Sequence, residues 1–403
     1  MKYRRYIYLA LATVAMLMAG IMYNFTVFTE AIASDFGVEA STVSLVFSLS
    51  QVCFFLGGLV LGFIYKKFKP QVLGAIAAVL MTLGLYLSSH TTAIWQLLLT
   101  YSILMNFAAG CTYKGVLAAV VPWFSDNLGV ATGVMMMGAG LTAFVFNVPV
   151  SNLIMATNWR FAMMILSLVS LVLTLIPAVV IQTKPEVPAS RKNETKAAGN
   201  QDGEYTTAQM LKTSQFYLFF IWTVMLLAGC TSVTGNSVGL SRSIGLETAK
   251  AAVVSTVISV SNAISRIVYG RIYDKKGRKM AMGITTLFFV TGVCAMHLAL
   301  ALRSVAILII AFVAIGFSFG GVPTIASTFV LRTFGRKNYA SNFGVQGSYS
   351  LFSPLFGTTT FSLLYKMTGN YQKSYLQILR YAAISVAMYL LLNKTMAGKE
   401  KTR

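Results

Sequence analysis

The stretch that decides the fold reads Val260-Ser-Asn-Ala-Ile-Ser-Arg266-Ile-Val-Tyr-Gly270-Arg-Ile-Tyr-Asp274-Lys-Lys-Gly277-Arg278-Lys279. Residues 251–270 are apolar over about the length that a bilayer core requires, so they predict a membrane-spanning helix. Arg266 is the single charged residue of that helix. A guanidinium in a membrane costs at least about 2.5 kcal/mol, so it usually faces a cavity or a partner. We therefore predict that Arg266 binds an anion.

A second interpretation of Arg266 is that its side chain snorkels to the membrane surface, because Arg271 follows shortly after it. However, the eight residues between Arg266 and Asp274 correspond to roughly 12 Å of helix, which places Arg266 deep in the span. This depth favours the anion-binding interpretation. The polar, glycine-containing turn that begins at Asp274 is a candidate gate.

The composition is that of a membrane protein. The chain has 403 residues, of which 56% are hydrophobic and 11% charged, and its mean hydropathy is +0.71. The apolar residues form long runs between short charged loops, which predicts a polytopic helical membrane protein. The net charge of +21 does not predict nucleic-acid binding, because the basic residues are scattered through these loops. The four cysteines lie in apolar runs and predict small buried side chains, not disulfides or metal ligands.

We predict an all-α membrane protein with twelve transmembrane helices, arranged as two six-helix pseudo-repeats. A polar linker over 184–213 separates an N-terminal half, 1–183, from a C-terminal half, 214–403. With the N-terminus inside, 23 of the 32 lysines and arginines fall in cytosolic segments, so both termini are predicted to be cytoplasmic. Parallel six-span repeats with a site near the midplane are typical of transporters. The predicted spans are 6–29, 43–65, 71–89, 93–121, 129–154, 161–182, 215–240, 248–272, 281–302, 304–330, 339–365 and 374–393.

The glycine-rich turn carries a family resemblance. Gly-x-x-x-Asp-Lys-x-Gly-Arg-Lys after the eighth span of a six-plus-six chain resembles the major facilitator superfamily, over essentially the whole chain. The resemblance implies that this turn belongs to a cytosolic gate. In the first half, Gly62 stands at the matching place and Lys66 replaces the acid, which puts a gating role of that copy in doubt. The residues that the resemblance assigns to the gate are Gly270, Asp274, Lys275, Gly277 and Arg278.

Within the superfamily, the chain is similar to the oxalate:formate antiporter and monocarboxylate porter families. The motifs that carry this similarity include Gly110-Cys-Thr-Tyr113, Gly320-Gly321 and Phe334-Gly335-Arg-Lys-Asn338. In those families the eighth-span arginine holds the substrate carboxylate and a fourth-span tyrosine assists, which implies these roles for Arg266 and Tyr113.

Two departures from those families are visible. Proton-coupled porters have an aspartate one turn before the arginine, where this chain has Asn262. The antiporter has an eleventh-span lysine, and residues 348–350 contain none.

Lys114 is a second cation inside a predicted span. Its depth matches that of Arg266, so we predict that it also contacts the substrate. The alternatives are that it reaches the cytosolic edge or bonds to backbone carbonyls. Arg380, near the outer end of the last span, is predicted to snorkel outward. Further candidates for the substrate site are Asn262, Tyr23, Phe319 and Tyr349, although packing alone also explains the aromatic residues.

The acidic residues bear on coupling. None of the 11 aspartates and glutamates lies well inside a span, with Glu30 at a border, so a carboxylate proton relay has no obvious carrier. We predict a secondary transporter for small organic carboxylates that works by alternating access, through anion exchange or facilitated transport. The alternatives are a proton-coupled monocarboxylate symporter and a carboxylate-sensing receptor that does not transport. We expect no enzymatic activity, cofactor, metal or nucleic-acid partner, and a monomer in the plasma (inner) membrane whose partners are a carboxylate and the lipid bilayer.

Overall fold

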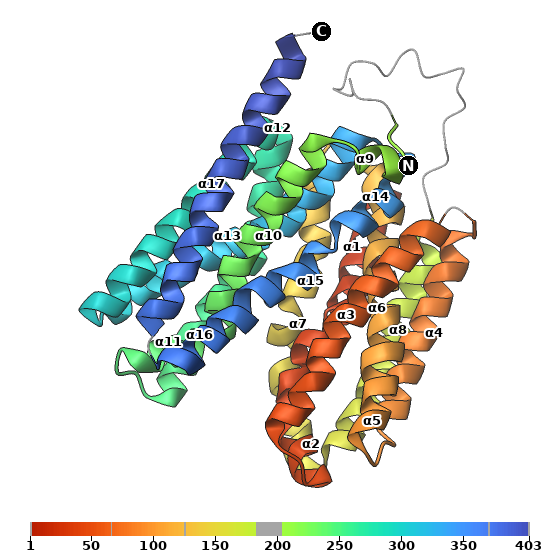
Figure 1. The fold of residues 1–403 in the computed structure, drawn as a ribbon. Helices are drawn as coiled ribbons and strands as arrows, with labels where there is room; N and C mark the ends of the chain where they lie inside the picture. Colours follow the sequence, from red (N-terminus) through yellow and green to blue (C-terminus); the bar gives the residue numbers. More distant parts are fainter. Residues whose placement is uncertain (1, 66, 125, 183–203, 370, 402–403) are drawn as a thin grey trace. The chain divides into compact units, whose positions relative to one another are not determined.

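The computed structural model of the protein describes residues 2–65, 67–124, 126–182, 204–369 and 371–401. These described residues form helices and no strand, so the all-α prediction is confirmed. The chain divides into two compact units (Figure 1). The first unit comprises Met1–Glu204 and Val330–Gly347, and the second comprises Tyr205–Phe329 and Ser348–Arg403. Most of the predicted linker, residues 184–203, lies outside the described residues, and the predicted boundaries of the two halves stay a prediction.

The first unit is a helical bundle in which α3 packs against α6, α4 against α8, and α1 against α7. The α4–α8 pair lies at one edge of this unit in Figure 1. Short segments of 3₁₀ or π geometry at Ile21–Phe28, Leu98–Met105 and Val121–Trp123 continue or bend the longer helices. The α-helices of this unit are α1 (Lys2–Ala19), α2 (Thr29–Phe36), α3 (Ala40–Ile64), α4 (Pro70–Ser88), α5 (Ile94–Leu97), α6 (Asn106–Val120), α7 (Leu128–Ala156), α8 (Trp159–Val180) and α14 (Tyr339–Gln346).

Local sequence explains where several of these helices begin. α4 begins with Pro70, which is suited to the first helical position because that position needs no amide donor. At α8, the Asn158 side chain accepts a hydrogen bond from the Phe161 amide at 2.8 Å and so caps the helix. An ion pair of 2.6 Å between Asp35 and Arg160 ties α2 to the same end of α8.

The second unit is organised around α10, which packs closely against α17. The Trp222 indole of α10 donates to Thr286 Oγ1 at 3.0 Å, and Phe219 stacks on Phe329 with ring centroids 3.8 Å apart. A π-helical segment, Leu355–Thr359, joins α15 to α16. The α-helices are α9 (Thr207–Met210), α10 (Ser214–Gly235), α11 (Ser237–Ser243), α12 (Thr248–Leu302), α13 (Val305–Phe334), α15 (Tyr349–Pro354), α16 (Thr360–Thr368) and α17 (Tyr371–Lys401), with the last turn of α13 counted in the first unit.

The predicted spans all fall on helical segments. Within the described residues, ten segments are long and apolar enough to cross a membrane. One of them contains two predicted spans, 248–272 and 281–302, because α12 continues through Gly277, where φ of 77° and ψ of −178° break the helical backbone. The remaining predicted span, 339–365, is divided among α14, α15, Leu355–Thr359 and α16. Cys53, Cys111 and Cys230 are buried as predicted, whereas Cys294 is exposed, since an apolar membrane helix also has an outward side.

Candidate substrate-binding site

Arg266 and Asn262 lie one turn apart on α12 and are brought together by the helix. The Arg266 Nε donates a hydrogen bond of 3.0 Å to Asn262 Oδ1. Both residues are buried, with 8% of their surface exposed. The amide therefore fixes the guanidinium in one orientation without adding a negative charge. Both were predicted site residues, and their role toward a substrate stays a prediction.

α13 approaches α12 closely beside this pair. A methyl group at Gly320 would clash with the carbonyl oxygen of Asn262 and with Ser265 Oγ, so only glycine permits this packing. The predicted site residue Phe319 is next to Gly320 and is half-buried. Of the other predicted aromatic residues, Tyr349 is buried in α15, and the side chain of Tyr23 lies outside the described part of the structure.

Lys114 of α6 is buried and is bound within the first unit. Its Nζ donates to the Phe343 carbonyl oxygen at 3.2 Å and lies 3.3 Å from the centroid of the Phe343 ring. The Tyr113 ring centroid is 5.9 Å from the same ammonium, and Tyr113 itself packs edge-on against Phe54. The structure thus contains the backbone-carbonyl contact that was one of the two alternatives for Lys114. Direct contact of Lys114 or Tyr113 with a substrate stays a prediction.

The predicted gate residues surround the break in α12. Gly277 has a positive φ, which residues other than glycine rarely adopt. The next residue, Arg278, donates a hydrogen bond from Nη1 to Asn393 Oδ1 of α17 at 2.8 Å. Asp274 is half-buried, Lys275 is exposed and Gly270 is buried. The turn is therefore anchored to α17, and its gating function stays a prediction.

In the first unit, the matching glycine also lies at a close helix contact. Ser341 Oγ of α14 donates to the Gly62 carbonyl oxygen at 2.7 Å, and a methyl group at Gly62 would lie 2.7 Å from the Ala340 carbonyl oxygen. α14 therefore packs directly on the end of α3. Lys66, which replaces the acid of the repeat, lies outside the described residues.

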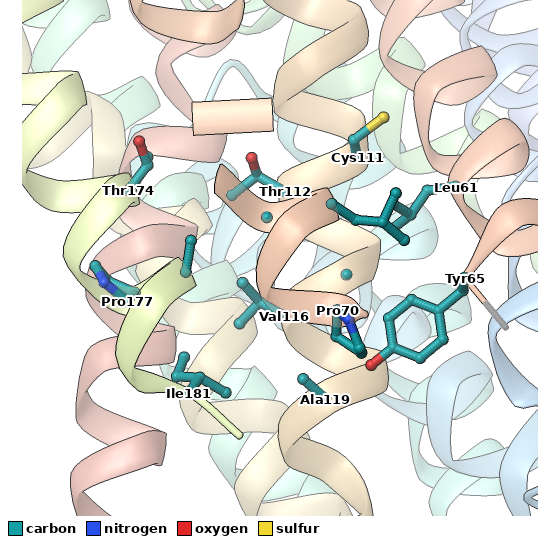
Figure 2. Close-up of a pocket in the computed structure, with 14 residues that line it drawn as sticks. Leu61, Tyr65, Pro70, Cys111, Thr112, Val116, Ala119, Thr174, Pro177 and Ile181 are labelled. Atoms are coloured by element: carbon teal, nitrogen blue, oxygen red, sulfur yellow. The ribbon is translucent and has the colours of Figure 1, made fainter. Parts of the chain in front are cut away.

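A small cavity in the first unit is not a suitable site for an anion. It has a volume of about 40 Å³ and lies between α3, α4, α6 and α8 (Figure 2). No charged side chain is among the described residues that line it. Tyr65 Oη and Thr112 Oγ1 are buried at its edge without a hydrogen-bond partner among the described residues. A cavity of this size holds a few water molecules, at about 10–15 Å³ each, and water is its fitting occupant.

Gln346 was absent from the predicted site. It is the last residue of α14, it has no exposed surface, and neither of its amide atoms has a hydrogen-bond partner among the described residues. The available signal was a carboxamide inside a predicted span. That signal is weak, because most such residues bridge helices.

Comparison with known proteins identifies the family. The family profile of the Major Facilitator Superfamily matches residues 9–358. The chain belongs to the major facilitator superfamily. Because members of this superfamily are transporters, the chain is a multi-pass membrane transport protein, and the resemblance seen in its sequence is confirmed.

Two curated superfamily members are similar over most of their length. The chain is 26% identical to the oxalate:formate antiporter of Oxalobacter formigenes over 362 residues, covering 86% of this chain and 83% of the antiporter. It is 23% identical to monocarboxylate transporter 13 of Rattus norvegicus over 359 residues, covering 89% and 82% respectively. Among solved structures, the proton:xylose symporter XylE, bound to 6-bromo-6-deoxy-D-glucose, superimposes with a TM-score of 0.70 at 14% identity, covering 98% of this chain and 96% of the symporter. This last similarity shows the fold alone.

Proposed function

We propose that this superfamily member is a secondary carrier of small organic carboxylates that works by alternating access, through anion exchange or facilitated transport. The observation that carries the proposal is the buried Arg266 guanidinium, held by Asn262 Oδ1 at 3.0 Å within an apolar helix. Such a residue is costly in a membrane and is usually functional.

The guanidinium suits a carboxylate by shape as well as by charge. Two parallel N–H groups of an arginine pair with the two carboxylate oxygens, which fixes the direction of the anion. Asn262 Oδ1 accepts from Nε at 3.0 Å and so helps to orient the guanidinium that we assign to the carboxylate.

Anion exchange follows from the cost of closing an empty site. Burying a cation in a dry state costs desolvation free energy, and a bound carboxylate offsets part of that cost. Return of the carrier is therefore favoured when it is loaded. The neutral Asn262 supports this mechanism over proton coupling, since it offers no carboxyl group to carry a proton.

The relatives support the same substrate class. Two similar proteins are named for the transport of oxalate and formate and of monocarboxylates. We accordingly expect the chain in the plasma membrane with both termini cytoplasmic, as the distribution of lysine and arginine predicts.

Counterflow in proteoliposomes tests the proposal. Liposomes that contain the purified protein and unlabelled oxalate or acetate should take up the labelled acid faster than unloaded liposomes. Saturable binding without counterflow would instead indicate a receptor. Uptake that requires an inward proton gradient would indicate a symporter and contradict exchange.

A further inference from the structure

Gln346 stands out among the buried carboxamides of the first unit. Asn106 Nδ2 donates to the Tyr101 carbonyl oxygen at 2.9 Å, and Asn24 Nδ2 donates to Asn147 Oδ1 at 2.5 Å. Gln346 has neither a donor nor an acceptor contact among the described residues, although none of its surface is exposed. A buried amide without partners destabilises a protein. The glutamine side chain therefore does not stabilise the fold at this position.

The turn that carries Gln346 also lies against Lys114. The ammonium bonds to Phe343, three residues earlier, and a methyl group at Gly347 would lie 2.8 Å from Nζ. Within the described part of the chain, no carboxylate lies within 4 Å of this ammonium. A neutral carbonyl and an aromatic ring compensate its charge only partly. The end of α14 thus combines a cation and an unused amide.

The chemistry of this pair indicates what it recognises. An amide offers N–H donors and a carbonyl acceptor, and neither has a partner in Gln346 within the described part of the chain. A hydroxyl group donates one hydrogen bond and accepts others, whereas a carboxylate only accepts. A hydroxycarboxylate therefore gives both ends of the amide a partner, since its hydroxyl donates to Oε1 and an acid oxygen accepts from Nε2. The Lys114 ammonium is suited to donate to the hydroxyl oxygen.

We propose that Gln346 is a specificity-determining residue of the carrier and that, with Lys114, it recognises the hydroxyl group of a hydroxycarboxylate substrate. The proposal rests on the carboxylate transport function proposed above. Gln346 has no exposed surface and Lys114 has 9%, so the anion reaches them through a conformational change, as alternating access requires.

Glycolate and acetate test this assignment, because they differ by one hydroxyl group. The full-length wild-type protein should bind glycolate at least about tenfold more tightly than acetate, measured by calorimetric titration. Gln346→Leu should lower the affinity for glycolate more than the affinity for acetate, and so reduce the glycolate preference, because acetate loses only the bond from Nε2 whereas glycolate also loses the bond to Oε1. Its melting temperature should not fall, because the replaced amide has no hydrogen-bond partner among the residues that the structure describes. An unchanged glycolate preference in Gln346→Leu, or equal loss for both acids, would overturn the proposal.

Two further variants keep the test decisive. Gln346→Glu retains the size but adds a negative charge beside Lys114, so it should weaken both acids, and wild-type binding of acetate would contradict the proposed location. Gln377→Leu is the matched control, since Gln377 Nε2 donates to Thr360 Oγ1 at 2.6 Å, and it should keep the glycolate preference. If neither acid binds the wild type, the proposed function fails. If binding depends on Arg266 but the preference for glycolate is the same in wild type and Gln346→Leu, this inference alone fails.

Discussion

Arg266 and Lys114 are both buried cations of membrane helices, but their partners are of different kinds. Arg266 bonds to an amide one turn away on its own helix. Lys114 bonds to a backbone carbonyl 229 residues away, on α14. The first contact moves with α12 as a rigid piece, whereas the second breaks whenever α14 moves away from α6. We infer that Arg266 is preorganised for a ligand by its own helix, whereas the position of the Lys114 ammonium depends on the packing of α14.

Removal of the preorganised cation should have the largest effect. We expect Arg266→Gln to lower carboxylate transport about 100-fold or more, because the anion loses its charged partner in a desolvated environment. Counterflow in proteoliposomes measures this loss. Arg380→Gln is the matched control. Because Arg380 is exposed on α17, this variant should transport at the wild-type rate. Wild-type rates for Arg266→Gln would refute the central role of this residue.

Truncation of the second cation should be selective. We expect Lys114→Ala to weaken a dicarboxylate by about 10- to 100-fold relative to a monocarboxylate, since a second carboxylate loses a charge-assisted hydrogen bond of about 1.5–3 kcal/mol. Inhibition of uptake by malonate and by acetate, in wild type and variant, measures the difference. An unchanged profile for both acids would leave Lys114 as a structural partner of the Phe343 carbonyl, with Arg266 as the substrate cation.

A change of the Arg266 partner should alter coupling. Asn262→Asp would place a carboxylate against the guanidinium, where it competes with the substrate, so we expect about tenfold weaker uptake at neutral pH. Protonation of the new acid at lower pH removes this competition, and uptake should therefore rise as the pH falls. Uptake rates from pH 5 to pH 8 in wild type and variant measure the effect. A variant with the wild-type pH profile would show that Asn262 does not control the orientation of Arg266.

The contrast between the two cations also shows what sequence predicts. Arg266 was visible because a single charge in an apolar run is unusual, and the partner at Asn262 follows from helical spacing. The helical spans followed from long apolar runs in the same way. These features depend on residues that are close in the sequence.

Contacts between residues that are far apart in the sequence could not be predicted. Every residue has a carbonyl group, so no sequence pattern identifies Phe343 as the acceptor for Lys114. The grouping of Val330–Gly347 with the first unit likewise depends on tertiary packing, as does the lack of partners for Gln346 among the described residues. The same holds for the Glu204 carboxylate, which accepts from the Lys337 amide at 2.5 Å across 133 residues.

The smallest effect is expected near the break in α12, about two turns beyond Arg266. If the turn around Gly277 is a gate, Asp274→Asn should slow turnover by about fivefold or less, since one charge near a helix terminus contributes up to about 1 kcal/mol. Binding should stay close to that of the wild type, because Asp274 lies about two turns from Arg266. Calorimetric affinity and counterflow rate, compared in one preparation, separate the two quantities. Lys275→Gln is the control, because the neighbouring lysine is exposed and its loss should change neither quantity. Equal losses of affinity and rate in Asp274→Asn would show that the charge affects the folding of α12 or the site itself, and the preorganised cation would then depend on this turn.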